Sequence, residues 1–228
     1  MHDLPDRARR SVGLSGDRLV ARRWAVVDVE TTGGSADAGD RITEFAAVIV
    51  EDGRVVDSFA SLVNPQRSIP LFITRLTGIS RAMVRDQPTF AELAPRIHDV
   101  LGGRTFVAHN ASFDWKFVNA ELTRATGAPL AGDRLCTVRL SRRLLSHLPR
   151  RNLDSVCRHY GVDITDRHRA LGDALATAQV LLRLLDDAGT RGCDTWADLD
   201  NLLTGRTARA KRRRRTALPH AADSDHSA

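Results

Sequence analysis

The chain has 228 residues, of which 42% are hydrophobic and 27% are charged, as in an ordinary globular protein with one substantial domain. No apolar run is long enough to cross a bilayer, and the first residues lack the apolar segment of a secretory signal. The three cysteines are scattered and odd in number, which argues against a disulfide framework and a structural zinc site. A cytoplasmic protein that does not bind a membrane is therefore expected.

The positive charge lies at the two ends of the chain. The formal net charge is +6, but six arginines against three aspartates give residues 1–23 a net charge of +3. Residues 206–228 carry six arginines and Lys211 against two aspartates, a net charge of +5, which leaves −2 for residues 24–205. A nucleic-acid enzyme whose carboxylates hold metal ions would show this distribution, although many unrelated domains would too.

Composition also divides the chain. Residues 1–22 have no hydrophobic periodicity and predict a flexible arm, and residues 23–204 predict one folded domain. Residues 205–228 predict a basic, disordered tail, which either attracts phosphate groups or serves as a solubilising end.

The first half of the chain predicts three consecutive strands. An apolar run begins at Trp24 and ends before two glycines, and a second strand is expected at 41–51. Asp52 and Gly53 form a hairpin signal, and a third strand is expected at 55–63. This order predicts an antiparallel meander.

The second half alternates between helices and short strands. Thr89 is the expected N-cap of the first helix, although Pro95 weakens that prediction. In chain order, the predicted elements are a helix at 90–101, a strand at 104–110, a helix at 111–126, a strand at 134–137, a helix through 145, helices at 153–160 and 169–187, and a short helix at 195–203. The predicted fold class is α/β, with a mixed five-stranded sheet flanked by helices.

Two carboxylates stand at the end of the first apolar strand. Asp28 and Glu30 are two residues apart, so both side chains point to the same face of the strand. The apolar residues around them predict burial on both faces, where two carboxylates repel one another unless a cation compensates them. A solvated acidic strand end is the alternative.

Three further candidates follow later in the chain. Asp114 lies in the first turn of a predicted helix. The alternative is that this aspartate only stabilises the helix by interacting with its dipole. His168 lies five residues before Asp173, and the two converge if the histidine is on the entry loop of the last long helix.

Four carboxylates from three segments suit a two-metal phosphodiester site. Two cations roughly 3.5–4 Å apart stabilise the attacking and leaving oxygens of such a reaction. Oxygen ligands favour Mg²⁺ or Mn²⁺, and a histidine can deprotonate the attacking water.

Three segments, VVDVETTG, HNASFDWKF and HRALGDA, resemble in order and spacing the motifs of the DEDDh family of DnaQ-like 3′–5′ exonucleases, the family of the DNA polymerase III epsilon-type domains. LTGIS, at 76–80, resembles the turn between the first two motifs. The resemblance covers residues 24–185 and implies a ribonuclease-H-like fold, release of nucleoside monophosphates from 3′ ends, and two bound Mg²⁺ or Mn²⁺ ions. It implies that Asp28, Glu30, Asp114 and Asp173 bind metal and that His168 is the general base.

The same resemblance implies contacts to the terminal nucleotide from Thr31, Leu76 and Thr77, and we add Asn110 and Phe113 of the second motif as expected contacts. Alternatives stay open for three of them. Thr31 could instead satisfy the turn that follows it, Leu76 could be ordinary core, and Phe113 could anchor its helix.

The expected partner is a nucleic acid with a free 3′ end, and a DNA polymerase is a further candidate. DNA is the preferred substrate, in proofreading or in repair. An RNA-trimming or oligoribonucleotide-degrading enzyme is the alternative with the same chemistry, since the choice depends on contacts to the 2′-hydroxyl. A non-catalytic nucleic-acid-binding module is the alternative from another class.

Overall fold

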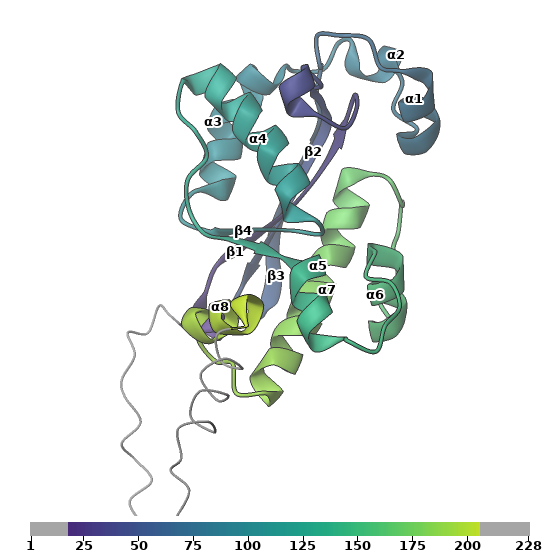
Figure 1. The fold of residues 1–228 in the computed structure, drawn as a ribbon. Helices are drawn as coiled ribbons and strands as arrows, with labels where there is room; N and C mark the ends of the chain where they lie inside the picture. The colour runs from purple at the N-terminus through teal and green to yellow at the C-terminus, as the bar shows by residue number, and fades with distance from the viewer. Residues whose placement is uncertain (1–17, 206–228) are drawn as a thin grey trace, which may run out of the picture.

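A mixed five-stranded sheet runs through the middle of the computed structural model, which describes residues 18–205 (Figure 1). The strand order is β3-β2-β1-β4-β5, with antiparallel pairs among the first three in sequence and parallel pairing of β4 with β1 and β5. The strands are β1 (Trp24–Thr31), β2 (Ile42–Glu51), β3 (Arg54–Leu62), β4 (Thr105–Ala108) and β5 (Arg134–Cys136). The predicted α/β class and the three-stranded antiparallel start are confirmed.

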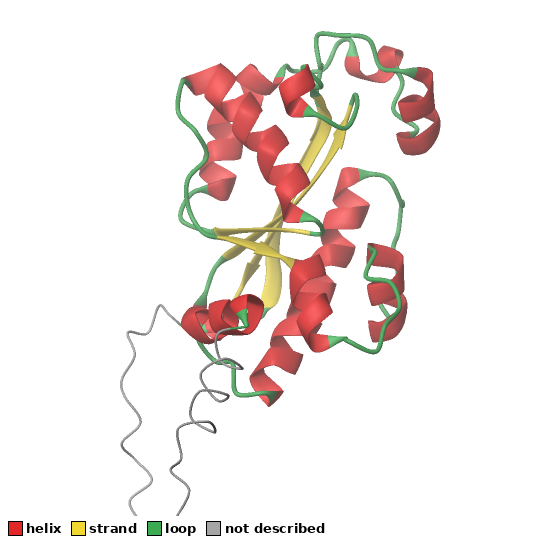
Figure 2. Cartoon of the chain, viewed as in Figure 1, coloured by secondary structure: helices red, strands yellow, loops and turns green. Residues whose placement is uncertain are grey.

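Helices cover both faces of this sheet (Figure 2). The α-helices are α1 (Leu71–Thr77), α2 (Arg81–Val84), α3 (Phe90–Leu101), α4 (Ala111–Thr126), α5 (Thr137–Leu144), α6 (Leu153–Tyr160), α7 (Ala170–Thr190) and α8 (Trp196–Thr204). Two short 3-10 helices, η2 (Leu19–Ala21) and η3 (Ala36–Ala38), precede and follow β1. No helix within residues 18–205 is both long and apolar enough to span a membrane.

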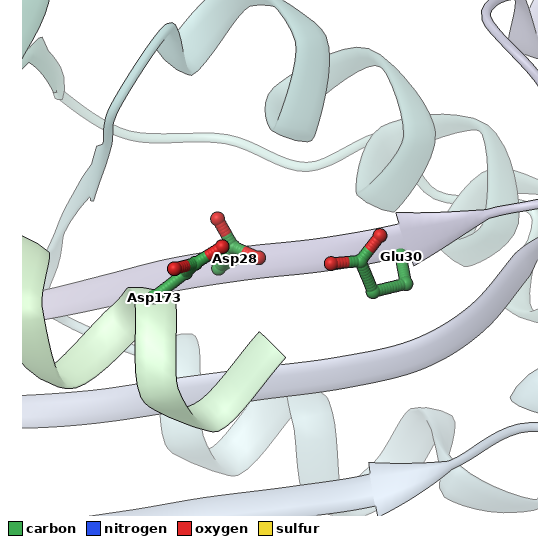
Figure 3. Close-up of side chains that lie close together, drawn as sticks. All are labelled: Asp28, Glu30 and Asp173. Atoms are coloured by element: carbon green, nitrogen blue, oxygen red, sulfur yellow. The ribbon is translucent and has the colours of Figure 1, made fainter. Parts of the chain in front are cut away.

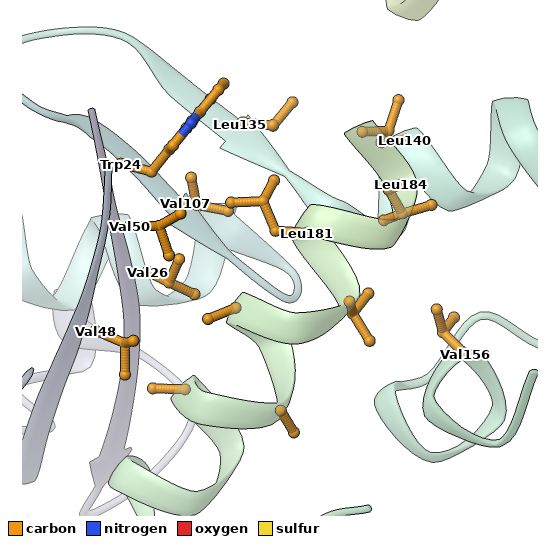
Figure 4. Close-up of a cluster of buried hydrophobic side chains, with 14 of the residues drawn as sticks. Trp24, Val26, Val48, Val50, Val107, Leu135, Leu140, Val156, Leu181 and Leu184 are labelled. Atoms are coloured by element: carbon orange, nitrogen blue, oxygen red, sulfur yellow. The ribbon is translucent and has the colours of Figure 1, made fainter. Parts of the chain in front are cut away.

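The central strand β1 separates two hydrophobic cores. Trp24 and Val26 belong to the core under α5, α6 and α7, whereas Ala25 and Val27 belong to the core under α3 and α4. Figure 4 shows the first of these cores, with Leu181 of α7 directed at Val107 of β4 and Leu184 lying toward Leu140 of α5. Because side chains alternate along a strand, the residues that follow Val26 at every second position face α7 as well.

Local sequence signals account for most element boundaries. The helices predicted at 90–101, 111–126 and 153–160 are confirmed, and α3 begins with a capping box in which Thr89 and Glu92 bond reciprocally. Asp52 and Gly53 both have positive φ, 50° and 71°, as the tight turn between β2 and β3 requires. The helices α1 and α2 were not predicted.

The described residues begin before the predicted domain boundary. Leu19 is buried, and its backbone N–H donates to the Asp194 carbonyl at 2.9 Å. The Arg22 guanidinium lies 4.1 Å from the centroid of a Trp196 ring. The last five residues of the expected flexible arm therefore pack on the domain, while residues 1–17 and 206–228, with nearly all of the expected tail, lie outside the described residues.

Candidate active site and metal centre

Strand β1 delivers two carboxylates to the face covered by α7. Asp28 and Glu30 follow Trp24 and Val26 at every second position, so all four side chains lie on the same face of β1. The first two are part of the apolar core, and the last two are acidic and lie near the end of the strand. Both side chains are half-buried. The predicted position of the pair, on a central strand with apolar neighbours on both faces, is confirmed.

The third carboxylate comes from the first turn of α7, which is tied to β2 by an ion pair between the buried Glu44 and the partly exposed Arg169. The Glu44 carboxylate accepts two bonds from the Arg169 guanidinium, at 2.7 and 3.1 Å, and one from the Ala170 backbone N–H at 2.9 Å. This clamp fixes the start of α7 over the sheet and thereby places Asp173, which is buried.

The three carboxylates converge. Asp28, Glu30 and Asp173 each present an oxygen, and these oxygens lie within 4.8 Å of one another, with the Asp28 and Asp173 groups facing each other in Figure 3. One buried oxygen of Asp173, Oδ1, has no hydrogen-bond partner in the described structure. A buried oxygen without a partner is costly, so Asp173 Oδ1 is available to a cation.

The electrostatics of the site agree with its geometry. The pKa of Asp28 is raised well above its ordinary range. Burial is the largest cause, and the negative charges of neighbouring carboxylates, of which Asp114 has the largest effect, follow it. Burial and the charge of Asp173 raise the pKa of Glu30 to about 8. Hard oxygen donors that repel one another in a buried place fit a divalent cation of the Mg²⁺ or Mn²⁺ type.

Asp114 lies at the border of this group and not within it. Strand β4 pairs with β1 only as far as Val26, and farther along β1 the Val29 N–H donates to Asp114 Oδ1 at 3.3 Å. Burial raises the pKa of Asp114 to about 7, although this bond and its own backbone N–H oppose the shift. The structure thus brings three of the four predicted ligands together and sets the fourth beside them.

Arg167 is a residue of the site that the sequence did not single out. Its guanidinium bridges Asp154 of α6, at 2.9 Å, and Asp173 Oδ2. It is the cation that balances Asp173 in this structure, and it opposes the rise in the pKa of that carboxyl that burial causes. No sequence signal identified it, because Asp154 and Arg167 are thirteen residues apart on different elements.

His168 lies on the loop that enters α7, as predicted. Its backbone has a positive φ of 63°, and its N–H donates to Asp173 Oδ2 at 3.3 Å. The loop rests directly on Gly172, where an added Cβ would lie 2.0 Å from the Thr165 carbonyl oxygen and 2.7 Å from that of Asp166. The half-buried histidine is thus held beside Asp173 by packing of its loop against the helix.

The other histidine of the motifs has a structural role. His109 bonds through its two ring nitrogens to the Thr137 hydroxyl and the Arg151 carbonyl, both at 2.9 Å. Burial lowers the pKa of His109 to about 4, so the ring is neutral near pH 7.

The expected nucleotide contacts fall into two groups. Thr31 and Thr77 are buried and use their hydroxyls internally: Thr31 donates to the Gly33 carbonyl at 2.6 Å, and Thr77 donates to the Ile73 carbonyl at 3.1 Å. For Thr31 the structure shows the turn-satisfying alternative. Leu76 is 54% exposed, so it is not a core residue.

Asn110 and Phe113 stand at the start of α4. Asn110 is exposed and left-handed, with φ 80°, and its side chain does not cap the helix. Phe113 is half-buried, with its ring centroid 4.9 Å from that of Phe117. Phe113 therefore anchors the helix and still presents part of its ring to solvent.

The raised carboxyl pKa values predict an unusual pH dependence for the metal-free protein. The pKa of Glu30 is about 8 in the folded state, against an ordinary value of 4.5. Between these two pH values the folded protein keeps a proton that the unfolded chain has released. In EDTA, the free energy of unfolding should therefore fall between pH 6.5 and 8, by up to about 1.4 kcal/mol per pH unit for each retained proton. Below pH 6.5, His109 acts in the opposite direction, because its folded-state pKa is lowered.

Thermal melts at pH 6.5 and 8, in EDTA and in Mg²⁺, test this expectation. The stabilisation by Mg²⁺ should be larger at pH 8, since metal ligands bind deprotonated. Glu30→Gln should flatten the pH dependence in EDTA. A melting temperature in EDTA that rises from pH 6.5 to 8 would contradict the assignment.

Comparison with known proteins places these observations in a family. Residues 25–181 match the RNase_T family model, described as exonuclease. A Mycobacterium tuberculosis protein named "Putative bifunctional exonuclease/endonuclease protein" is 43% identical over 206 residues, which cover 86% of this chain and 32% of that protein. The DNA polymerase III subunit epsilon of Aquifex aeolicus is 33% identical over 171 residues, which cover 75% of this chain and 84% of the subunit.

A solved structure of exonuclease X in complex with 5′ overhanging duplex DNA has a TM-score of 0.61 and 28% identity, and the match covers 73% of this chain and 93% of that one. The fold and the acidic centre thus place the chain in the class of DnaQ-like, DEDDh-type exonuclease domains with a ribonuclease-H-like fold. The chain belongs to the RNase_T exonuclease family, and it spans about a third of the length of its mycobacterial relative.

Proposed function

We propose that the chain removes nucleoside monophosphates from the 3′ ends of DNA with two divalent cations, Mg²⁺ or Mn²⁺, held by Asp28, Glu30, Asp173 and Asp114. The observation that carries this proposal is the convergence of three carboxylates within 4.8 Å, with an unpartnered buried oxygen on Asp173. When bound, such cations stabilise the negative charge that develops on the attacking and leaving oxygens.

The protein's own residues supply the remaining steps. His168, on the rim of the site, takes the proton of the attacking water, and the buried carboxylates hold the site in a fixed geometry before the substrate arrives. Arg167 is also paired with Asp154, so its guanidinium would stay beside the carboxylates as a positive group if a cation replaced it at Asp173.

The preference for DNA has support from the relatives. The Aquifex protein is a subunit of a DNA polymerase, and the exonuclease X structure contains duplex DNA. The same similarity makes a DNA polymerase a candidate partner. On the same grounds the proposed location of the enzyme is the cytoplasm. An RNA-degrading enzyme of the same family is the competing proposal, since the site has the same chemistry for both sugars.

One comparison of rates tests the proposal. The full chain, with Mg²⁺ or Mn²⁺, should release monophosphates from a 3′-labelled single DNA strand and from a mismatched duplex end faster than from a short RNA of the same sequence. EDTA should abolish all three rates. A faster rate on RNA would establish the competing enzyme, and no metal-dependent release from any substrate would show a non-catalytic binding module.

A further inference from the structure

Exposed apolar side chains gather on the two short helices between β3 and α3. Leu71, Phe72 and Leu76 of α1 are 64%, 66% and 54% exposed, and Met83 of α2 is 38% exposed. Phe72 and Leu76 are four residues apart, so they lie on the same face of α1. Exposed apolar groups clustered in this way mark a binding surface.

The same segment carries a net positive charge. Residues 64–88 contain four arginines and one acidic residue, Asp86, a net charge of +3, although residues 24–205 as a whole carry −2. Arg75 and Arg81 are exposed, and neither has an ion pair or a side-chain hydrogen bond within residues 18–205. Their charges are therefore available to an external anion.

A hollow in this surface is lined almost entirely by polar side chains. It has a volume of about 540 Å³. Its lining includes Asn64, Gln66, Arg67, Ser68, Arg81 and Arg85. Arg67 and Arg85 are partly engaged with Asp40 and Asp86, which leaves Arg81 as the uncompensated cation of the hollow.

The surface stands at the active-site end of the molecule. Figure 1 shows α1 and α2 projecting beyond the end of the sheet toward which β1 runs, on the side where α7 begins. Asp28, Glu30 and Asp173 lie on those two elements. A strand whose 3′ end lies at the carboxylates can thus continue along α1 without crossing the body of the domain.

We infer that the surface formed by α1, α2 and the 64–70 loop binds single-stranded nucleic acid upstream of the terminal nucleotide. Phe72 packs against an upstream base, next to Leu76, the expected contact of the terminal nucleotide, and Arg75 and Arg81 contact backbone phosphates. Aromatic and cationic side chains side by side are the usual means of holding a single strand without reading its sequence. A protein partner would require acidic groups opposite the arginines, and nothing in the described residues favours one. The inference rests on the proposed function of the site.

Binding of fluorescent single strands of 2 and 12 nucleotides to the full chain, measured by anisotropy in EDTA, tests the inference without hydrolysis. Phe72→Ala should raise the Kd for the 12-nucleotide strand by roughly 5- to 100-fold, the equivalent of one lost base stack. Arg81→Gln should make the salt dependence of log Kd shallower by about 0.7, the value for one phosphate on a single strand. Neither variant should change the weak binding of the dinucleotide.

Matched controls lie on the far edge of the sheet. Val56→Ala and Arg54→Gln replace an exposed apolar and an exposed basic residue of β3 and should leave both Kd values unchanged. Melting temperatures equal to that of the wild type verify folding. An unchanged Kd for the 12-nucleotide strand in both Phe72→Ala and Arg81→Gln would overturn the inference and leave the surface to a protein partner.

A separate assay distinguishes failure of the inference from failure of the proposed function. Metal-dependent hydrolysis of a nucleoside monophosphate p-nitrophenyl ester requires the active site and no upstream nucleotides, so the two surface variants should hydrolyse it at the wild-type rate. If the wild type does not hydrolyse the ester, the proposed function fails. The anisotropy measurement would still show whether the surface binds the 12-nucleotide strand.

Discussion

Asp28→Asn is expected to abolish metal-dependent release of nucleotides and to raise the melting temperature of the metal-free protein. The amide keeps the shape of the carboxylate but removes the central charge of a site whose members lie within 4.8 Å of one another. Burial and repulsion already raise the pKa of Asp28, so its charge costs stability when no cation is present. Release of a 3′-labelled nucleotide and thermal melts in EDTA measure the two effects.

The control for this variant is Asp163→Asn, which removes one exposed negative charge from the loop before α7. It should keep the wild-type rate, because it does not contribute to the three-carboxylate group. If Asp28→Asn retained a substantial metal-dependent rate, or lost the effect of Mg²⁺ on rate without any change in its effect on melting temperature, the metal assignment would be wrong.

His168→Ala is expected to lower the rate by about 10²- to 10⁴-fold, the usual effect of removing a general base. The response of the melting temperature to Mg²⁺ should remain, since the hydrogen bond of this residue to Asp173, a proposed metal ligand, comes from its backbone N–H. Rates on a single DNA strand from pH 6 to 9, together with melts in the presence and absence of Mg²⁺, test both statements.

His98→Ala, which removes an exposed histidine in the last turn of α3, is the matched control and should behave as the wild type. Near-normal rates of His168→Ala across that pH range would assign the proton transfer to another group. Arg167 could not replace it, since an arginine keeps its proton at these pH values.

Sequence periodicity predicted the long elements because their boundaries depend on local chemistry. The capping box of Thr89 and Glu92, the asparagine cap of α6 and the left-handed glycine after α4 are all readable without a partner. The helices α1 and α2 have seven and four residues, too few for a periodic pattern, and Pro70 at the start of α1 supplies no side-chain cap. Their existence depends on burial of Ile73, Thr77, Ile79 and Val84, which only the folded structure shows.

The candidate site was predictable where a residue type and its spacing carry the signal. Asp28, Glu30 and Asp173 meet as expected, whereas the position of Asp114 beside the group depends on where β4 stops pairing with β1. Arg167 could not be found in this way, because its significance lies in contacts with two carboxylates on different helices. The exposure of Leu76 likewise follows from the projection of α1 and not from its own sequence.

The contact between Gly172 and the preceding loop has a consequence for how such a site evolves. Since a single methyl group at position 172 would collide with the Thr165 carbonyl oxygen, the distance from His168 to the helix is set by the absence of a side chain. Asp28 and Glu30 lie on β1, away from that contact. One small substitution at position 172 would thus displace the His168 loop while the two carboxylates of β1 stay in place, which is a short route to the loss of the proposed proton transfer.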